Sequence, residues 1–203
     1  MTCRLQAIGF GNYLLGSALR LRGVDLLPTA ARHLRRALEA ARQKGDAIKD
    51  EIWAELAACN YEQWQQEAML RSAKTAQLRE QLNKWLSAES GGHPQGRPSS
   101  SFSKSPKAWE ELFAAAEQGD TPREVPGAFQ CPLTMSIFRE PVITPAGNSY
   151  ERTALLQHLA HNGPCDPISK TRVTSDQLIV NVGLRAAVAA YLEEHPWAWD
   201  ECR

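Results

Sequence analysis

Residues 131–152 read CPLTMSIFREPVITPAGNSYER, and the second half of this stretch decides the local fold of the C-terminal part of the chain. Residues 141–144 and 149–150 are two short runs rich in strand-forming side chains. Residues 145–148, which read Pro-Ala-Gly-Asn, separate the two runs and have the composition of a turn. The stretch therefore predicts a strand, a turn and a second strand.

Two helices are predicted after these strands. The first covers residues 151–161, turns three leucines inward and is ended by Asn162-Gly163. Asn181 is the predicted N-cap of the second helix, because a side-chain oxygen at this position can accept a hydrogen bond from the first turn. Four residues form the predicted buried face of that helix: Leu184, Val188, Tyr191 and Leu192.

A shift in composition divides the chain. Most of residues 90–106 are Ser, Gly or Pro, and such a stretch is typical of a flexible linker. A short amphipathic helix carrying Trp109, Leu112 and Phe113 is predicted just after it. The predicted organisation is a helical region at 1–89, a linker at 90–106, a short helix and connector at 107–126, and a mixed domain at 127–203.

The helical region is predicted to contain one long helix. Residues 46–89 hold no Gly or Pro, and Asp46 is the predicted N-cap. Its apolar stripe is only partial, so the helix must pack on its neighbours or on a second chain. Upstream, Gly16 and Ala30 occupy small-residue positions of a tetratricopeptide-like repeat, and an ordinary helical hairpin is the alternative.

Composition limits the classes of function. Lys plus Arg and Asp plus Glu both number 23, which argues against nucleic acid as a partner. No apolar run approaches the roughly 20 residues of a membrane helix. The five scattered cysteines suit reduced thiols in the cytoplasm, and also in the nucleus. The absence of acidic residues before Asp25 leaves an organelle transit peptide as an alternative.

The C-terminal motifs resemble a U-box, the RING-shaped module of ubiquitin ligases. They are Cys131-Pro132-Leu133-Thr134, Arg139-Glu140-Pro141-Val142, Tyr150-Glu151-Arg152, Asp166-Pro167 and Gln177-Leu178-Ile179 with Asn181. The flanking Glu110-Glu111-Leu112-Phe113 and the tail from Ala190 to Trp197 are similar to the CHIP-type, chaperone-linked U-box ligases, those of plants and algae above all. The resemblance implies an α+β chain with a helical, repeat-derived N-terminal region and a zinc-free U-box.

The resemblance also implies a function. A CHIP-type protein is a ubiquitin ligase that recruits a charged ubiquitin-conjugating enzyme and directs ubiquitin to misfolded or chaperone-bound proteins. It works as a homodimeric scaffold, without a covalent intermediate. Residue by residue, it implies a binding groove formed by Leu133, Met135, His158 and Pro167, with Lys170 as the basic contact. The alternative for Leu133 and Met135 is a place in the hydrophobic core.

Metal and cofactor are not expected. A RING binds two zinc ions with eight Cys or His ligands. Residues 129–203 contain only three cysteines and three histidines, and no C-x2-C pair. Hydrogen bonds and charge pairs must then hold the loops, and the polar residues assigned to this network are Glu140, Tyr150, Arg152, Asp166 and Asn181.

Two alternatives to this scheme stay open at the level of sequence. His158, His161 and Cys165 could bind a zinc ion with Cys131 as the fourth ligand, although this spacing is not a standard site. Cys131 or Cys165 could instead accept ubiquitin as a thioester, which would need an activated thiolate beside a base.

The chain departs from the family pattern at several positions. Lys170 stands where CHIP has an Arg, and Val180 stands where a Pro precedes the capping Asn. The first two repeats have no counterpart, and Phe10 falls where a clamp Lys for the chaperone carboxylate is expected. Glu51 matches an acidic residue at the clamp edge. These departures weaken the expectation of binding to heat-shock chaperones. They also define a rival function, a non-catalytic helical adaptor or co-chaperone with a degenerate U-box.

Overall fold

The computed structural model describes residues 2–90, 106–117 and 122–202. It is an α+β structure, as predicted, and its contacts divide the chain into two units. The first unit combines residues 1–63 with residues 123–203, and the second unit comprises residues 64–122. The predicted linker lies almost wholly at 91–105, outside the described residues, so the predicted segment boundaries stay predictions. None of the described helices is both long and apolar enough to cross a membrane.

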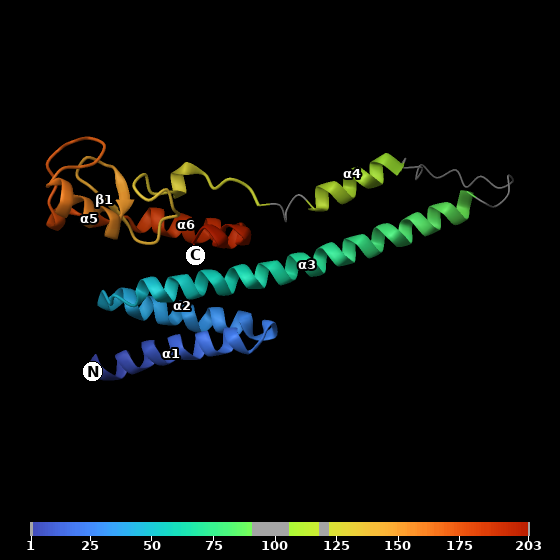
Figure 1. The fold of residues 1–203 in the computed structure, drawn as a ribbon, viewed down its shortest axis with the longest axis horizontal. Coiled ribbons are helices and arrows are strands. Elements are labelled where there is room, and N and C mark those ends of the chain that lie inside the picture. Colours follow the sequence, from blue (N-terminus) through green and yellow to red (C-terminus); the bar gives the residue numbers. More distant parts are fainter. Residues whose placement is uncertain (1, 91–105, 118–121, 203) are drawn as a thin grey trace. The chain divides into compact units, whose positions relative to one another are not determined.

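The first two helices form an antiparallel pair (Figure 1). They are α1 (Thr2–Arg22) and α2 (Leu27–Lys44), and a short 3₁₀ turn joins them. A Cβ added at Gly16 would lie 2.7 Å from Leu34 Cγ and 3.2 Å from the carbonyl oxygen of Ala30. Glycine is therefore required for this close approach, as the small-residue pattern predicts. The assignment of the pair to a tetratricopeptide-like repeat stays a prediction.

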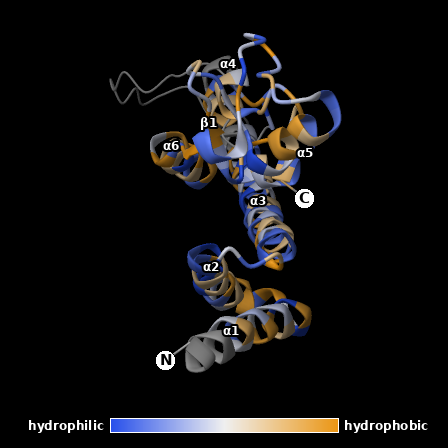
Figure 2. Ribbon diagram, turned by 90° about the vertical axis from the view of Figure 1, so that its left-hand side faces the viewer, coloured by the Kyte–Doolittle hydropathy of each residue, from blue (hydrophilic) through white to orange (hydrophobic). Residues whose placement is uncertain are grey.

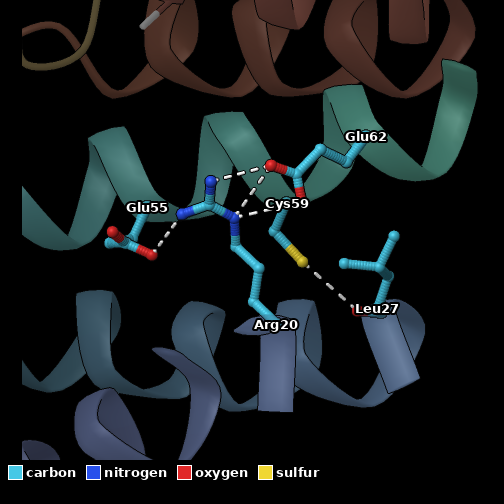
Figure 3. A network of polar contacts seen from close by, with 5 residues as sticks. All are labelled: Arg20, Leu27, Glu55, Cys59 and Glu62. Atoms are coloured by element: carbon cyan, nitrogen blue, oxygen red, sulfur yellow. Dashed lines mark hydrogen bonds and ion pairs between the residues drawn. The ribbon is translucent and has the colours of Figure 1, made fainter. Parts of the chain in front are cut away.

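A polar network joins α1 to the long helix α3 (Lys49–Ser90) (Figure 3). The guanidinium of Arg20 donates hydrogen bonds of 2.7 Å to both Glu62 and Glu55 of α3. The bond with Glu62 contributes most to a pKa of Arg20 above its usual value. Beside the network, Cys59 donates to the carbonyl oxygen of Leu27 at 3.3 Å, and burial raises the pKa of Cys59 to about 11. These contacts place the α1–α2 pair against the first part of α3.

The long helix begins three residues after the predicted start. Asp46 accepts a hydrogen bond from the N–H of Ile48 at 3.4 Å, so it stabilises a turn that precedes α3. The prediction that Asp46 is the N-cap was therefore wrong, because the chain completes this turn before the helix starts. In the second unit the predicted short helix is observed as α4 (Pro106–Glu117). There the guanidinium of Arg79 lies 5.1 Å from the ring centre of Phe113.

The C-terminal part of the first unit is built around a three-stranded antiparallel sheet. Its strands are β1 (Pro141–Ile143), β2 (Ser149–Glu151) and β3 (Ile179–Val180), in the order β2-β1-β3. The predicted strand–turn–strand is confirmed by β1 and β2. Gly147 adopts a φ of 85° in the connecting turn, and the N–H of Thr144 donates to the carbonyl of Asn148 at 2.9 Å. A positive φ here favours glycine, which has no Cβ to clash.

Two helices and a C-terminal turn complete this part. The first is α5 (Arg152–Asn162), which agrees with the predicted bounds within one residue, and the second is α6 (Val182–Glu194), which begins directly after the predicted N-cap, Asn181. The chain continues as a 3₁₀ helix (Pro196–Cys202). Within the first unit, Figure 2 shows the α1–α2 pair on one side of the first part of α3 (residues 49–63) and the sheet with α5 and α6 on the other. The core of this part is apolar and includes Val142, Tyr150, Leu155, Val173, Val188 and Leu192, each at most 2% exposed.

Candidate functional site

Two loops of the C-terminal part share one hydrogen-bonding pattern. In residues 131–136 the N–H of Cys131 donates to the carbonyl of Ser136, and the N–H of Met135 donates back to Cys131, both at 2.8 Å. Residues 166–171 repeat this pattern: the N–H of Asp166 donates to Thr171 at 2.8 Å, and the N–H of Lys170 donates to Asp166 at 3.0 Å. The two loops are therefore closed in the same way, and we call them loop 1 (131–136) and loop 2 (166–171).

The fifth residue of each loop has an unusual backbone conformation. Met135 has a φ of 55° and Lys170 a φ of 59°, in the left-handed region that residues with a Cβ seldom adopt. Such a conformation costs about 1–3 kcal/mol and persists only where the surroundings enforce it. The loops project these two side chains into solvent, because Lys170 is exposed and Met135 is 70% exposed.

The side chain of the first residue organises each loop from inside. The sulfur of Cys131 accepts hydrogen bonds from the N–H groups of Leu133 at 3.4 Å and Glu151 at 3.2 Å. One Asp166 carboxylate oxygen accepts the N–H groups of Ile168 and Ser169, both at 2.9 Å. Cys131 and Asp166 are both fully buried. In a RING a bound zinc ion holds each loop in its conformation. Here hydrogen bonds from backbone N–H groups to the side chains of Cys131 and Asp166 hold the loops.

Asp166 is the centre of a larger buried network. Its carboxylate accepts hydrogen bonds from the hydroxyls of Thr144 at 2.7 Å and Tyr150 at 2.8 Å, and from the amide of Asn148 at 3.2 Å. Burial works to raise the pKa of Asp166, but the bonds from Ser169, Thr144 and Tyr150 outweigh it, so the pKa lies below its usual range. Burial, and then the bond to Asp166, raise the pKa of Tyr150.

Strand β2 holds the two loops together. Its residue Tyr150 bonds to Asp166 of loop 2, and the N–H of the next residue, Glu151, bonds to Cys131 of loop 1. Since Tyr150 and Glu151 are neighbours in the chain, both loops are anchored within one residue of each other on the same strand. The tips that carry Met135 and Lys170 are therefore presented from one rigid base.

Glu151 has a second role that the sequence did not indicate. Its carboxylate accepts hydrogen bonds from the backbone N–H of Arg139 at 2.8 Å and of Glu140 at 3.1 Å. Burial raises the pKa of Glu151, although these two backbone bonds act in the opposite direction. Thr144 and Asn148 were missed as well, because a Thr and an Asn beside a turn are ordinary turn residues. The local sequence pointed to a role for these residues only through the number of polar residues around a buried strand.

The predicted network residues take different places. Tyr150 and Asp166 form the centre just described, and the Asn181 side chain accepts the N–H of Leu184 at 3.0 Å while its amide donates to Ser149 at 3.1 Å. The N–H of Arg152 donates to the carbonyl of Glu140 at 3.1 Å, and its side chain is exposed. The Glu140 carboxylate instead pairs with Arg42 and Lys49 of the helical region.

Four of the predicted groove residues lie in the two loops, and His158 lies on α5. Leu133 and Pro167 are half-buried, and Ile168, which the sequence did not indicate, is 61% exposed beside Pro167. The exposure of Met135 rules out the alternative that it is a core residue. His158 lies half-buried on α5, with Nδ1 3.0 Å from the amide of Asn162. Its Nε2 is buried and has no hydrogen-bond partner among the described residues.

The part of the chain that the structure describes contains no candidate metal site. No group of three or more His, Cys, Asp or Glu side chains lies close enough together there to bind an ion. Cys59, Cys131, Cys165 and Cys202 are free thiols, and all but Cys165 are buried.

The chain should therefore keep its fold and melting temperature after dialysis against a strong chelator, because hydrogen bonds to Cys131 and Asp166 do the work of metal ligands. Circular dichroism before and after dialysis checks this expectation. Unfolding on chelation that added zinc reverses would contradict it.

Comparisons with known proteins agree with this geometry. The U-box domain model matches residues 125–197. The chain is 34% identical over 196 residues to the E3 ubiquitin-protein ligase CHIP of Arabidopsis thaliana, covering 93% of this chain and 70% of that protein. It is 32% identical over 98 residues to U-box domain-containing protein 56 of the same plant, covering 44% of this chain and 27% of that protein. A third relative is the WD repeat, SAM and U-box domain-containing protein 1 of Gallus gallus, which is 33% identical over 72 residues, covering 36% of this chain and 15% of that protein.

The fold, with its two loops closed by hydrogen bonds, is that of a U-box protein. Because the Arabidopsis relative aligns along nearly the whole chain, helical region included, the chain belongs to the CHIP-type family of U-box proteins.

Proposed function

We propose that this chain is a ubiquitin ligase, whose U-box binds a charged ubiquitin-conjugating enzyme and directs ubiquitin to misfolded or chaperone-bound proteins. The observation that carries the proposal is the pair of loop tips, where Met135 and Ile168 are exposed although large apolar side chains favour burial. Exposed apolar anchors on a rigid base are typical of a protein-binding surface. We call the surface formed by Leu133, Met135, Pro167, Ile168 and Lys170 the recruitment groove.

The polar members of the site fit the same proposal. Lys170 is exposed at the tip of loop 2 and supplies a positive charge beside the apolar anchors, where it would restrain the bound ubiquitin. As a point charge it lacks the planar, two-pronged geometry of an Arg, so we expect weaker restraint than in relatives with Arg. His158 contributes to the edge of the groove from α5.

The mechanism proposed is scaffolding without a covalent intermediate. A thioester would need a reactive thiolate, but Cys131 is fully buried and its sulfur is occupied by two backbone donors. Cys202 is also buried, and burial raises its pKa to about 12. Cys165 is the most accessible of the described thiols. The chain would then act by holding the conjugating enzyme and its ubiquitin in a reactive arrangement.

Changing Cys165 to Ser should leave the rate of ubiquitin transfer unchanged, because no bond to this sulfur forms in a scaffolding mechanism. Gel electrophoresis without reducing agent gives the matching readout, and no thiol-sensitive ubiquitin adduct of the chain should be seen. An adduct that disappears in Cys165→Ser would show that the chain carries ubiquitin covalently.

Partners and location belong to the proposal as well. The second part of α3 exposes Met69, Leu70, Leu78 and Trp85, which supports a homodimer that covers these side chains. The free thiols support a reducing compartment, the cytoplasm and also the nucleus. Contact with heat-shock chaperones has weaker support, because Phe10, at the expected position of a clamp Lys, is an exposed apolar residue.

A reconstituted reaction tests the proposed function. It contains activating enzyme, ubiquitin, ATP and a panel of conjugating enzymes, and measures how fast charged conjugating enzyme is discharged onto free lysine. Addition of this chain should accelerate discharge with at least one member of the panel. Failure to accelerate any of them would favour the rival function, a non-catalytic adaptor whose U-box no longer recruits.

A further inference from the structure

The face of the U-box that carries Glu140 is in contact with the helical region of the same unit. The Glu140 carboxylate pairs with Lys49, at the start of α3, and lies 3.9 Å from the guanidinium of Arg42 on α2. Arg42 also donates to the carbonyl oxygen of Arg139 at 3.3 Å. All three charged side chains are less than one-fifth exposed. Charge pairs with so little solvent contact are screened less than pairs on an open surface.

An aromatic contact lies next to these charges. The rings of Trp53 on α3 and Trp199 in the C-terminal 3₁₀ helix are 5.5 Å apart between centres, and each side chain is 7% exposed. The Arg42 guanidinium lies 5.5 Å from the Trp53 ring centre, so charge and aromatic contacts share this residue. Burying a tryptophan removes about 150–250 Å² of surface from water, which makes this pair a large apolar contribution.

The tail that supplies Trp199 is not part of the U-box match. The match ends at residue 197, whereas Trp199 and Cys202 follow it, and both are buried. The guanidinium of Arg139 donates to the carbonyl oxygen of Cys202 at 3.3 Å, which fixes the tail to the turn that carries Glu140. The extra residues therefore complete the surface that meets the helical region.

The recruitment groove stays free in this arrangement. Met135 and Ile168 keep 70% and 61% of their surface exposed, and Lys170 is exposed as well. Near the base of loop 1, Asp50 of α3 and Ser136 line a polar cavity of about 420 Å³. The contact with the helices thus reaches the base of loop 1 without covering the tips.

We propose that this contact, which we call the Glu140 latch (Arg42, Lys49, Trp53, Glu140 and Trp199), fixes the U-box on its own helical region. The latch sets the direction in which the recruitment groove faces, so the contact with the helices determines which lysines receive ubiquitin, those of a bound protein and those of the chain itself alike. This consequence rests on the proposed ligase function, whereas the latch itself does not.

Cleaving the chain between α4 and the U-box tests the latch directly. A recognition sequence for a specific protease is inserted at Gly119–Asp120 of the full chain, and the cleaved protein is passed over a size-exclusion column at micromolar concentration. The U-box fragment should stay with the helical fragment, and separation of the fragments would overturn the proposal.

Charge reversal shows whether the latch holds the fragments. Lys49→Glu should weaken their association at least about 30-fold, as expected when one partner of a little-exposed charge pair is reversed. Glu140→Lys should do the same, and combining Lys49→Glu with Glu140→Lys should restore part of the association. Glu193→Lys, an exposed reversal on α6, is the matched control and should change nothing. Unchanged association in both single reversals would overturn the proposal.

Two further readouts separate the latch from the ligase function. Because Lys49 is on α3 and outside the U-box, circular dichroism of Lys49→Glu should show an intact fold. Discharge of the conjugating enzyme onto free lysine should also be unchanged in this variant, since the groove is untouched. Mass spectrometry should nevertheless find ubiquitin on a wider set of lysines of the chain. Unchanged discharge with an unchanged set of lysines would refute the directing role of the latch, whereas failed discharge by the unmodified chain would refute only the ligase proposal.

Discussion

Met135→Ala should reduce ubiquitin transfer about 30-fold or more while leaving the melting temperature nearly unchanged. Met135 is 70% exposed at the tip of loop 1, so its side chain contributes little to the core of the U-box. Truncating a central apolar anchor of a small interface commonly costs about 2 kcal/mol or more of binding free energy, which corresponds to about 30-fold in affinity. The left-handed backbone at this position, φ 55°, is equally costly for Met and Ala, so the backbone term cancels.

The activity and the melting curve of Met135→Ala must be measured on the same preparation. Leu21→Ala serves as the matched control, because Leu21 is an even more exposed apolar side chain, at 84%, and lies on α1 outside the U-box. It should retain full activity. Normal ubiquitin transfer by Met135→Ala would contradict the proposal that the recruitment groove binds the conjugating enzyme. A large fall in its melting temperature would show that the side chain stabilises the fold after all.

The sequence was most informative where structure is determined locally. The strand–turn–strand at β1 and β2 follows from strand-forming residues on both sides of Pro145-Ala146-Gly147-Asn148, and each feature acts over a few residues. The same holds for α5 and α6. Strand β3 has only two residues, and it is a strand because Ile179 and Val180 pair with β1. No local pattern of two residues could have predicted that pairing.

The buried network was only partly predictable, because it too depends on contacts between segments that are distant in the chain. The shortage of Cys and His ligands indicated that a polar network must hold the loops, and Tyr150 and Asp166, two of the residues assigned to it, bond to each other at 2.8 Å. Which donors meet Asp166 depends on how loop 2 folds back over the turn, and the partner Thr144 is 22 residues away in the chain. Glu151 was not singled out, because a glutamate before a helix is ordinarily a solvent-exposed residue.

Glu140 shows most clearly that the partner of a side chain cannot always be predicted from sequence. The motif Arg139-Glu140-Pro141 suggested a role inside the U-box, and its backbone does bond to Glu151 and Arg152. Its carboxylate, however, meets Lys49, which is 91 residues away in the chain. Such a pairing is set by how distant segments pack, and the spacing of residues in one chain does not encode it. The recruitment groove, in turn, was named from family resemblance and not from the pattern of residues.

Asp166→Asn should destabilise the U-box strongly. The Asp166 carboxylate is fully buried and accepts hydrogen bonds from three side chains and two backbone N–H groups. An amide replaces one acceptor oxygen by a donor, which leaves donors such as the Tyr150 hydroxyl and the Asn148 amide to compete for fewer acceptors. Removing one partner of a buried charged network costs about 3–5 kcal/mol. For a domain of this size that loss lowers the melting temperature by more than about 10 °C.

Differential scanning calorimetry measures this effect, with Glu193→Gln as a matched loss of one exposed carboxylate on α6. The control should melt like the unmodified chain. Equal melting temperatures for Asp166→Asn and the unmodified chain would show that the network does not hold the loops.

The shifted pKa of Asp166 predicts how the stability of the fold depends on pH. The pKa of Asp166 is lower in the folded chain than in an unfolded chain, where it is about 3.9. Its ionised form therefore stabilises the fold above pH 4, and this stability is lost as the pH falls through the lower folded value. Glu151 acts in the opposite sense, because its raised pKa makes protonation on mild acidification favour the folded state. The melting temperature of the unmodified chain should consequently change little down to about pH 5 and fall steeply below pH 4. In Asp166→Asn the melting temperature should fall much less steeply below pH 4, because the titrating group is gone. An equally steep fall in that variant would mean that other carboxylates control acid unfolding.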